Sequence, residues 1–389
     1  MRRSTSAVGA LRAVGAVALS ACGGNASPGR DDGGKDGAGA SGFKIKLSAQ
    51  DGATNAGIND TGVKVSGGRL TTVRLVQVDN GSDAKGSIAA DGSSWKPAVQ
   101  PERGTKYKVV ANAKDAKGRT ATESATFTTI SSKNSFIGSY MPGDGSTVGV
   151  GIPVPFTFDK AITDKKDVQS HITVTSNSGQ KVAGHWFGAQ RLDFRPEQYW
   201  KAGSRVTLKI GLDGVKGGEG ITGVQSETVS FTIGRSQVST VDMNTRAMTV
   251  VRDGKTIKSI PISGGSPQNP TYNGQMTISE KPAQTRMDST TVGFPKGTYD
   301  IPDVPHAMRL SNSGTFIHGN YWGNPPDFGR AGTSHGCVGL RDNKGGGNTP
   351  GTWFFDQSLI GDVVVVKNSP EGLNGRNMRW SQWQASNAA

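Results

Sequence analysis

The chain has few cysteines and no long apolar run, and each shortage excludes a class of protein. Only Cys22 and Cys337 occur among 389 residues, which excludes a disulfide framework and a zinc site built from cysteines. No stretch of about 18 apolar residues exists, so an ordinary transmembrane helix is not expected. Hydrophobic residues make up 33% of the chain and glycine reaches 56 residues. This composition favours β-sheets joined by many turns over a helical bundle, and the length fits two to four domains.

The N-terminal residues are typical of an export signal. Arg2, Arg3 and Arg12 precede a short apolar stretch, 13–19, which small residues follow. Cys22 comes directly after Leu-Ser-Ala, and this pattern resembles the lipobox of bacterial lipoproteins. The resemblance implies cleavage before Cys22, a lipid on its sulfur, and an extracytoplasmic protein anchored to the outer face of the cytoplasmic membrane. An ordinary signal peptide with a chance cysteine is the alternative.

The residues after Cys22 predict a flexible tether. Eight of the twenty residues 23–42 are glycine, and none is aromatic or β-branched. Such a coil spans roughly 25 Å. Loss of 1–21 removes three arginines and lowers the net charge from +13 to +10. On an exported protein this surplus suggests contact with anionic wall polymers or lipid headgroups, with solubility alone as the alternative. Compartment and motifs both argue against nucleic acid as a partner.

Two parts of the chain repeat one another at a spacing of about 100 residues. Three motifs recur in the same order: Asp51–Thr54 as Asp144–Thr147, Pro101-Glu102 as Pro196-Glu197, and Glu123–Thr128 as Glu227–Thr232. Apolar residues alternate with polar ones over 107–113 in the first copy and 206–212 in the second. A repeat of this length with alternating strands predicts two immunoglobulin-like β-sandwiches. Neither copy holds a cluster of catalytic type, and His171 and His185 stand isolated.

The remainder of the chain predicts a different β-rich unit with one short helix. Apolar stretches flank Asp253-Gly254, which is a strong signal for a hairpin with a two-residue turn. A helix is expected near 349–359, with Thr349 as N-cap and Pro350 at its first position. Gly361 ends it, and 362–366 predicts a buried strand.

The residues with catalytic potential lie around the second cysteine, Cys337. Cys337 lies in Ser334-His335-Gly336-Cys337, and His318 comes 16 residues before Ser334. A thiol attacks as the thiolate, and a nearby imidazole lowers its pKa or takes its proton. Two histidines near one cysteine, in a chain with only five histidines, indicate a nucleophilic site. A structural cysteine beside two surface histidines is the alternative.

This motif resembles the signature of the L,D-transpeptidase (YkuD-type) catalytic domain, a histidine followed after about 14 to 17 residues by Ser/Thr-His-Gly-Cys. The resemblance covers 236–389, and two immunoglobulin-like domains precede that domain in actinobacterial members. Segments 270–274 and 287–289 look like further family segments near the substrate cleft. Trp380-Ser381-Gln382-Trp383 resembles a tryptophan-bearing tail that packs on the domain.

The resemblance implies a role for each matching residue. Cys337 is the nucleophile and His318 the base, with the carbonyl of Gly319 orienting the imidazole. The N–H groups of Gly336 and Cys337 form an oxyanion hole. Ser334 and His335 support the site. The substrate-binding residues are then Tyr299, Trp322, Tyr321, Met287 and Ser289, of which Tyr299 offers a phenolic donor. Trp322 and Tyr321 belong either to a substrate lid or to the core, and His306 is structural.

One position departs from the family pattern. Many members carry Asn or Arg two residues after the cysteine, where this chain has Gly339. A polar group close to the thiol is therefore missing, and Arg341 or Asn343 is a candidate replacement. The departure predicts reduced activity or an altered substrate.

The family implies a peptidoglycan L,D-transpeptidase that forms 3→3 cross-links through a thioester on stem tetrapeptides, without a metal or organic cofactor. Carbapenem-type β-lactams are expected to acylate it. The alternatives are L,D-carboxypeptidase action, attachment of a protein or D-amino acid to the stem, and a catalytically silent wall-binding lipoprotein. The predicted segments are a signal peptide (1–21), a tether (22–42), immunoglobulin-like domains (43–130 and 131–234), a catalytic domain (235–368) and a C-terminal tail (369–389).

Overall fold

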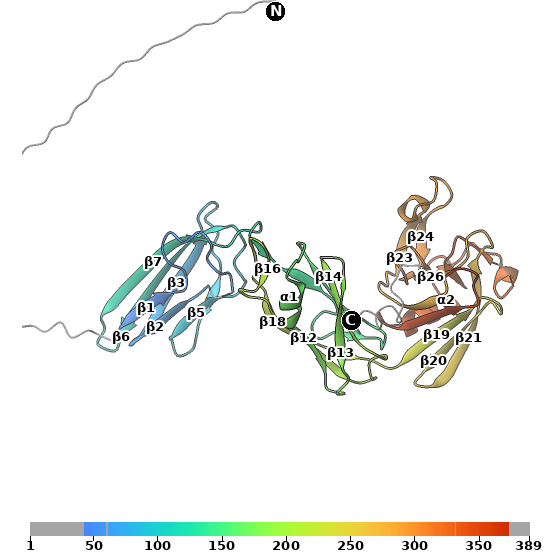
Figure 1. Cartoon of the computed structure of the whole chain (residues 1–389), viewed down its shortest axis with the longest axis horizontal. Helices are drawn as coiled ribbons and strands as arrows, with labels where there is room; N and C mark the ends of the chain where they lie inside the picture. The colour runs from blue at the N-terminus through green and yellow to red at the C-terminus, as the bar shows by residue number, and fades with distance from the viewer. Residues whose placement is uncertain (1–42, 60, 331, 373–389) are drawn as a thin grey trace, which may run out of the picture. The chain divides into compact units, whose positions relative to one another are not determined.

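The computed structural model describes residues 43–59, 61–330 and 332–372. These residues form β-sheets around three hydrophobic cores, with few helices, which confirms the predicted fold class (Figure 1). The signal peptide, Cys22, the tether and the tryptophans of the tail lie outside the described residues. Within the described ranges, no helix has the length and apolar character needed to cross a bilayer.

The first group of strands is a sandwich of two antiparallel sheets. Its strands are β1 (Lys44–Leu47), β2 (Val63–Ser66), β3 (Gly68–Gln77), β4 (Gly86–Ile88), β5 (Ser94–Pro97), β6 (Lys106–Asp115) and β7 (Thr120–Thr128). One sheet has the order β1-β2-β5-β4 and the other β3-β6-β7. The alternation predicted over 107–113 lies on β6, where Tyr107, Val109 and Ala111 are buried in the core between the sheets.

The second group is also a sandwich. Its elements are β8 (Ser135–Phe136), β9 (Gly138–Tyr140), β10 (Thr147–Val148), β11 (Val154–Phe158), α1 (Lys165–Ser170), β12 (Ile172–Ser176), β13 (Val182–Phe187), β14 (Arg191–Pro196), β15 (Arg205–Gly211), β16 (Lys216–Gly218), β17 (Ile221–Gly223) and β18 (Ser226–Ile233). The main sheets have the orders β10-β18-β15-β12 and β13-β14-β11-β9. The short helix α1 was not predicted.

The two sandwiches make the same contact at the aspartate of their shared motif. Oδ1 of Asp51 accepts a hydrogen bond from the N–H of Thr126 at 2.6 Å, and Oδ1 of Asp144 accepts from the N–H of Ser230 at 2.8 Å. In each copy the glycine after the aspartate donates its N–H to the carbonyl of that same partner. The sequence repeat is therefore also a repeat of contacts, while the predicted boundary between 130 and 131 stays a prediction.

The third group holds the predicted catalytic segment. Its elements are β19 (Gln237–Asp242), β20 (Ala247–Arg252), β21 (Lys255–Gly265), β22 (Gly274–Thr277), β23 (Gln284–Asp288), η1 (Ser289–Val292), β24 (Asp300–Pro305), β25 (Met308–Arg309), β26 (Phe316–Asn320), η2 (Pro325–Asp327), β27 (Gly332–Ser334), β28 (Val338–Arg341), α2 (Pro350–Gln357) and β29 (Val363–Lys367). The main sheet has the order β22-β29-β19-β20-β21-β28-β26-β25, and β27 pairs with β21. Strands β23 and β24 form a separate hairpin.

The hairpin turn and the helix start predicted for this unit are confirmed, but the predicted helix end is not. The turn at Asp253-Gly254 joins β20 to β21, and both turn residues have positive φ, as a two-residue hairpin turn requires. Thr349 caps α2 by accepting the N–H of Thr352. The helix ends at Gln357, two residues before the predicted end.

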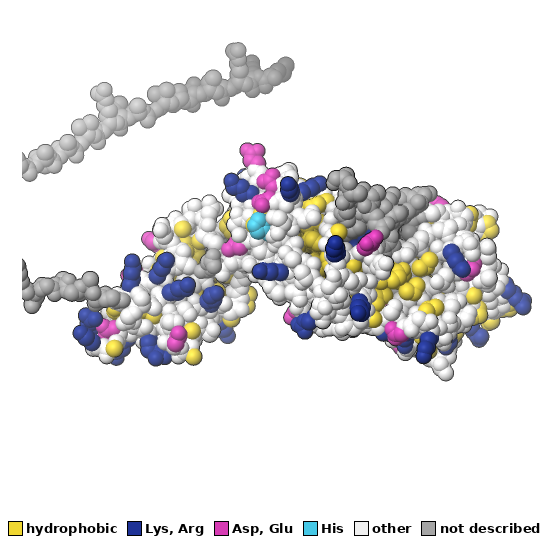
Figure 2. All heavy atoms as spheres, turned by 60° about the horizontal axis from the view of Figure 1, so that its bottom comes forward, with side chains coloured by type: hydrophobic (Ala, Val, Ile, Leu, Met, Phe, Trp, Pro, Cys, Tyr) yellow, Lys and Arg dark blue, Asp and Glu magenta, His cyan; other side chains and the backbone are white. Residues whose placement is uncertain are grey.

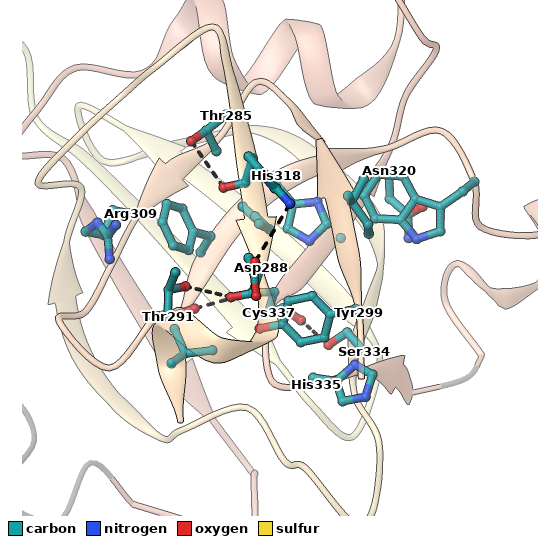
Figure 3. Close-up of a pocket in the computed structure, with 18 of the residues that line it drawn as sticks. Thr285, Asp288, Thr291, Tyr299, Arg309, His318, Asn320, Ser334, His335 and Cys337 are labelled. Carbon is teal, nitrogen blue, oxygen red and sulfur yellow. Dashed lines mark hydrogen bonds and ion pairs between the residues drawn. The ribbon is translucent and has the colours of Figure 1, made fainter. Parts of the chain in front are cut away.

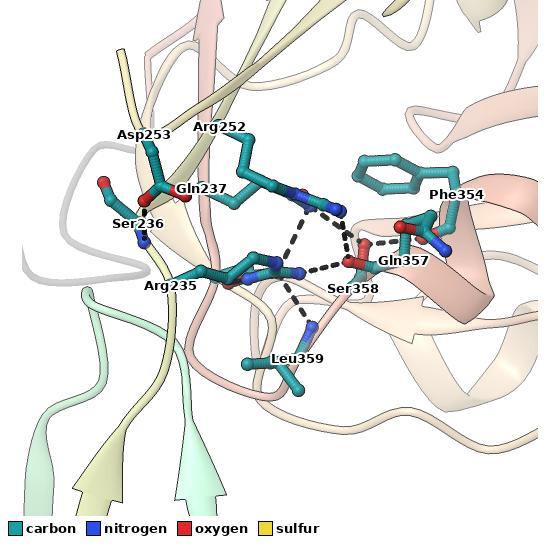
Figure 4. A network of polar contacts seen from close by, with 10 residues as sticks. Arg235, Ser236, Gln237, Arg252, Asp253, Phe354, Gln357, Ser358 and Leu359 are labelled. Carbon is teal, nitrogen blue, oxygen red and sulfur yellow. Dashed lines mark hydrogen bonds and ion pairs between the residues drawn. The ribbon is translucent and has the colours of Figure 1, made fainter. Parts of the chain in front are cut away.

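A polar network ties the end of α2 to the beginning of β29 (Figure 4). Arg235 forms a bidentate ion pair with the buried Asp362, at 2.8 and 2.9 Å. Arg235 and Arg252 both donate to the carbonyl of Gln357, the last residue of α2. Helix α2 in turn packs against β26 and β28. The network therefore supports the two strands that carry the candidate site.

Candidate active site

A pocket of about 270 Å³ lies among β26, β28 and the β23–β24 hairpin. It brings together seven of the residues predicted for the site: Met287, Tyr299, His318, Trp322, Ser334, His335 and Cys337. Figure 3 shows Arg309 and Thr291 on one side of this pocket and Asn320, Tyr299 and His335 on the other. The expected convergence of His318 and Cys337 on one cleft is confirmed.

The register of two strands explains this convergence. Strands β26 and β28 are parallel neighbours, and His318 pairs with Gly339. Side chains alternate between the faces of a strand, so residues two apart share a face. His318 and Asn320 therefore face the pocket from β26, and Gly339 faces it from β28 with Cys337 just before that strand.

His318 is held as a neutral base. Its side chain is buried, and burial lowers its pKa below the ordinary value. Its Nδ1 lies 2.9 Å from the carbonyl oxygen of Gly319, which is the contact that the family resemblance implied. A carbonyl can only accept, so Nδ1 carries the proton and Nε2 keeps a free lone pair. The indole of Trp322, which is 42% exposed, stacks on the imidazole at 5.6 Å between ring centroids.

The thiol of Cys337 is half-buried. Burial raises its pKa to about 11, while the N–H of Phe316 and the charge of Arg309 act in the opposite direction. The thiol donates a hydrogen bond to the carbonyl of Gly314, with 3.6 Å between sulfur and oxygen. At this pKa the thiol is protonated near neutrality, and the same pocket holds the unprotonated Nε2 of His318.

Ser334 shapes the loop that carries the cysteine. Its hydroxyl donates to the carbonyl of Cys337 at 2.6 Å and accepts the N–H of Gly336 at 3.1 Å. Gly336 has φ +113°, in the region that favours glycine. Of the two expected oxyanion-hole donors, the N–H of Gly336 is already used within the loop, and the N–H of Cys337 stays a prediction.

The opposite wall comes from the hairpin of β23 and β24. Arg286 and Asp300 pair across it at 2.6 Å. Met287 lines the pocket from β23, and Tyr299 lines it from just before β24. The ring of Tyr299 lies 5.0 Å from that of His335. Burial, with the nearby Cys337, raises the pKa of Tyr299 to about 12, so its hydroxyl is a proton donor at neutral pH.

Two predicted substrate-binding residues do not line the pocket. Ser289 is fully buried and its hydroxyl donates to the carbonyl of Pro295, so it supports the turn after β23 instead of facing substrate. Tyr321 directs its hydroxyl to Asp303 at 2.6 Å, outside the pocket lining. The prediction for Ser289 is wrong because its side chain is inaccessible, whereas contact of the half-buried Tyr321 with substrate stays a prediction.

The suggested replacements for the missing polar group are also wrong. Arg341 and Asn343 are exposed and lie outside the pocket lining. His306, which was expected to be structural, pairs through Nδ1 with Oδ2 of the buried Asp342 at 2.6 Å.

Sequence reasoning missed several pocket residues. Asn320, Arg309, Phe316 and Gly314 all line the cavity, yet none belongs to the cysteine motif. Asn320 and Phe316 each lie two residues from His318, so the period of a strand was the signal that would have found them. Gly314 and Arg309 precede β26 in the sequence, and no local pattern marks them. Within the described ranges, no three His, Cys, Asp or Glu side chains gather as metal ligands would.

A protonated thiol and a neutral, oriented imidazole in one pocket define the site of a cysteine-dependent acyl-transfer enzyme in a β-rich fold. The model of the L,D-transpeptidase catalytic domain matches residues 236–366. The model of a bacterial Ig domain matches 54–216, as one match across both sandwiches.

Known proteins similar to this chain are L,D-transpeptidases. L,D-transpeptidase 2 of Mycobacterium tuberculosis is 34% identical over 355 residues, which cover 89% of this chain and 85% of the relative. L,D-transpeptidase 1 of the same organism is 28% identical and covers 59% of this chain and 84% of its own length. A solved LD transpeptidase in complex with imipenem has a TM-score of 0.50 at 28% identity, covering 59% of this chain and 97% of that one. The chain belongs to the L,D-transpeptidase family, and it is an L,D-transpeptidase.

Proposed function

We propose that this enzyme forms 3→3 cross-links between peptidoglycan stems, with Cys337 as nucleophile and His318 as base. The observation that carries the proposal is the shared pocket in which the carbonyl of Gly319 fixes the proton of His318 on Nδ1. That tautomer leaves Nε2 as the atom that accepts a proton.

The first half of the reaction forms a thioester. Nε2 of His318 takes the proton of the Cys337 thiol, and the sulfur attacks the carbonyl carbon of the third residue of a tetrapeptide stem. The bond between residues three and four then breaks, and the imidazolium returns its proton to the leaving amine of the D-amino acid. Because burial raises the pKa of Cys337 to about 11, proton removal and attack occur together rather than from a preformed thiolate.

The second half transfers the acyl group. The side-chain amine of a diamino acid on a second stem loses a proton to Nε2 and attacks the thioester carbonyl. The carbon–sulfur bond breaks, and the sulfur recovers the proton from the imidazolium. With water as acceptor the same steps give L,D-carboxypeptidase action, and with another amine they give attachment of a protein or D-amino acid to the stem.

The donor groups of the site fit this chemistry. The hydroxyl of Tyr299 stays protonated at neutral pH and faces the pocket, so it is available to the oxygen that becomes negative during attack. The exposed indole of Trp322 covers one face of the imidazole. We assign Trp322 to the substrate-facing wall rather than the core, since 42% of it is exposed.

The test uses the full chain carrying Cys22→Ser, which leaves Cys337 as its only thiol. The protein is incubated with a disaccharide-tetrapeptide, and products are followed by mass spectrometry beside a Cys337→Ala control. A Cys337-dependent dimer that has lost one terminal D-amino acid supports 3→3 transpeptidation. A tripeptide alone identifies carboxypeptidase action. No conversion with several donor stems contradicts the proposed activity and favours a silent wall-binding protein.

We further propose that carbapenem-type β-lactams acylate Cys337, because a β-lactam carbonyl is a strained acyl donor for the same thiol. The similarity to a structure in complex with imipenem supports this assignment. Intact-protein mass spectrometry should show one added drug molecule in the chain with Cys22→Ser. The Cys337→Ala chain should show none, and an equal adduct in it would contradict thiol acylation.

The cellular location is likewise a proposal. We propose an extracytoplasmic enzyme anchored by lipid on Cys22, which the lipobox pattern supports. Residues 43–130 carry 13 Lys and Arg against 8 Asp and Glu, and Figure 2 shows basic side chains spread over the visible face. Such a surface favours contact with anionic wall polymers. Labelling of the chain with a radioactive fatty acid in cells, lost on Cys22→Ala, tests the anchor.

A further inference from the structure

Asn320 carries an amide group into the pocket that no part of the proposed mechanism uses. It is only 8% exposed, lies two residues after His318 on β26, and lines the same cavity as Cys337. An asparagine amide offers one acceptor, Oδ1, and two N–H donors on Nδ2.

The orientation of the amide follows from its one fixed contact. The N–H of Gly323 donates to Oδ1 of Asn320 at 2.8 Å. Because a backbone N–H cannot accept, the atom facing it must be the oxygen, and Nδ2 with its two hydrogens must lie on the other side. Nothing in the described part of the chain accepts a hydrogen bond from Nδ2, and it lies at the wall of the pocket.

Gly339 provides the space into which this amide extends. A Cβ atom at position 339 would lie 3.2 Å from Nδ2 and 3.4 Å from Cβ of Asn320. Both distances are tight for a carbon contact, so a side chain at 339 would compete with the amide of Asn320 for the same volume. The observed position of the Asn320 amide therefore depends on the absence of a side chain at Gly339.

The pocket needs hydrogen-bond donors for the oxygens of a substrate, and Nδ2 of Asn320 is one that no group within the described residues uses. The N–H of Gly336 is used by Ser334, so the pocket has fewer donors for a carbonyl oxygen than the cysteine motif alone implies. A stem peptide brings several carbonyl and carboxylate oxygens, all of them acceptors.

We infer that Nδ2 of Asn320 donates a hydrogen bond to a carbonyl oxygen of the donor stem peptide, taking the place of the polar side chain that is missing at Gly339. This inference rests on the proposed function, and it makes Asn320 a substrate-positioning residue that approaches from β26 rather than β28. On this inference Gly339 does not reduce activity, because the polar group near the thiol is supplied by Asn320 instead.

The test compares variants of the Cys22→Ser chain in single-turnover acylation of Cys337 by a tetrapeptide, followed by intact mass. Asn320→Asp keeps an oxygen for Gly323 but loses the donor, and Asn320→Ala loses both. Both should acylate about 10–100-fold more slowly, as expected when one hydrogen-bond donor to the substrate is removed. Asn324→Asp is the matched control, since Asn324 is exposed just after β26 and its side chain makes no cap hydrogen bond. Its acylation rate should equal that of the parent.

A reciprocal exchange gives a second readout. Gly339→Asn alone should slow acylation because two amides compete for one space, whereas Gly339→Asn with Asn320→Ala should recover at least tenfold over Asn320→Ala. An Asn320→Asp chain with the parent's rate and melting temperature would overturn the inference. So would a folded double variant no faster than Asn320→Ala. Failure of the parent chain to be acylated by any stem would instead overturn the proposed function.

Discussion

The carboxylate of Asp342 occupies the space that a side chain at Gly319 would fill. Asp342 is buried, accepts from Nδ1 of His306, and accepts from the hydroxyl of Thr349 at the start of α2. Gly319 is the residue whose carbonyl holds the imidazole of His318. A buried acidic group thus fixes, through a glycine, the position of the proposed base.

Gly319→Ala should therefore reduce both stability and activity. The added methyl group overlaps a buried carboxylate that cannot move without breaking its hydrogen bonds, so we expect a loss of about 1–3 kcal/mol in the free energy of unfolding. The carbonyl of residue 319 should shift, which slows acylation of Cys337. Gly143→Ala is the control, because a Cβ there meets nothing within 4 Å. Equal denaturant midpoints and acylation rates for both variants would contradict this account.

The reactivity of the thiol should rise steadily with pH. With a pKa of about 11, Cys337 is almost wholly protonated near neutrality, and its thiolate fraction grows about tenfold per pH unit. Alkylation by iodoacetamide in the Cys22→Ser chain should follow this slope between pH 7 and 9.5 without a plateau. His318→Ala should keep the same slope, since no imidazolium stabilises the thiolate. A plateau below pH 8 that disappears in the variant would indicate an ion pair instead.

His318 should make the protein less stable in acid. Its pKa in the folded state is lowered by burial from the ordinary value of 6.5, so below that pH the unfolded chain binds a proton that the folded chain does not. The free energy of unfolding is therefore unaffected by this group above pH 6.5. As the pH falls below 6.5 it decreases, by at most about 1.4 kcal/mol per pH unit. Denaturant titrations at pH 5, 6 and 7.5 should show this slope in the parent and a smaller one in His318→Gln. Identical slopes would show that His318 is not the group responsible.

The sequence predicted most of the fold because its signals were local or repeated. The turn at Asp253-Gly254, the cap at Thr349 and the two copies of the aspartate contact each depend on a few neighbouring residues. The cysteine motif likewise identified Cys337, and the strand register brought His318 to it.

The parts of the site that the sequence did not predict depend on contacts between distant segments. The hydroxyl of Ser289 was assigned to substrate because 287–289 resembles a family segment near the substrate cleft, but the turn after β23 buries it. Arg341 was considered for its charge, yet it is the last residue of β28 and is exposed, outside the pocket lining. Asn320 was overlooked because its proposed role depends on the space beside Gly339. That space is evident only from the pairing of β26 with β28.

Arg235 should contribute strongly to the stability of the catalytic unit, because it neutralises a carboxylate that is 1% exposed (Figure 4). Burial raises the pKa of Asp362, and Gln237 and the N–H of Leu359 also donate to this carboxylate. Arg235→Ala leaves the buried charge without its cation, so we expect a loss of about 3–5 kcal/mol in the free energy of unfolding.

The ion pair of Arg74 with Asp83 is the matched control, because it has a similar length of 2.9 Å but is largely exposed. Arg74→Ala should change stability by less than about 1 kcal/mol. A double variant, Arg235→Leu with Asp362→Leu, should lose less than Arg235→Ala alone, since it removes the stranded charge. If Arg235→Ala cost no more than Arg74→Ala in urea titrations, the network would be a solvated contact, and support for α2 and β26 would have to come from apolar packing alone.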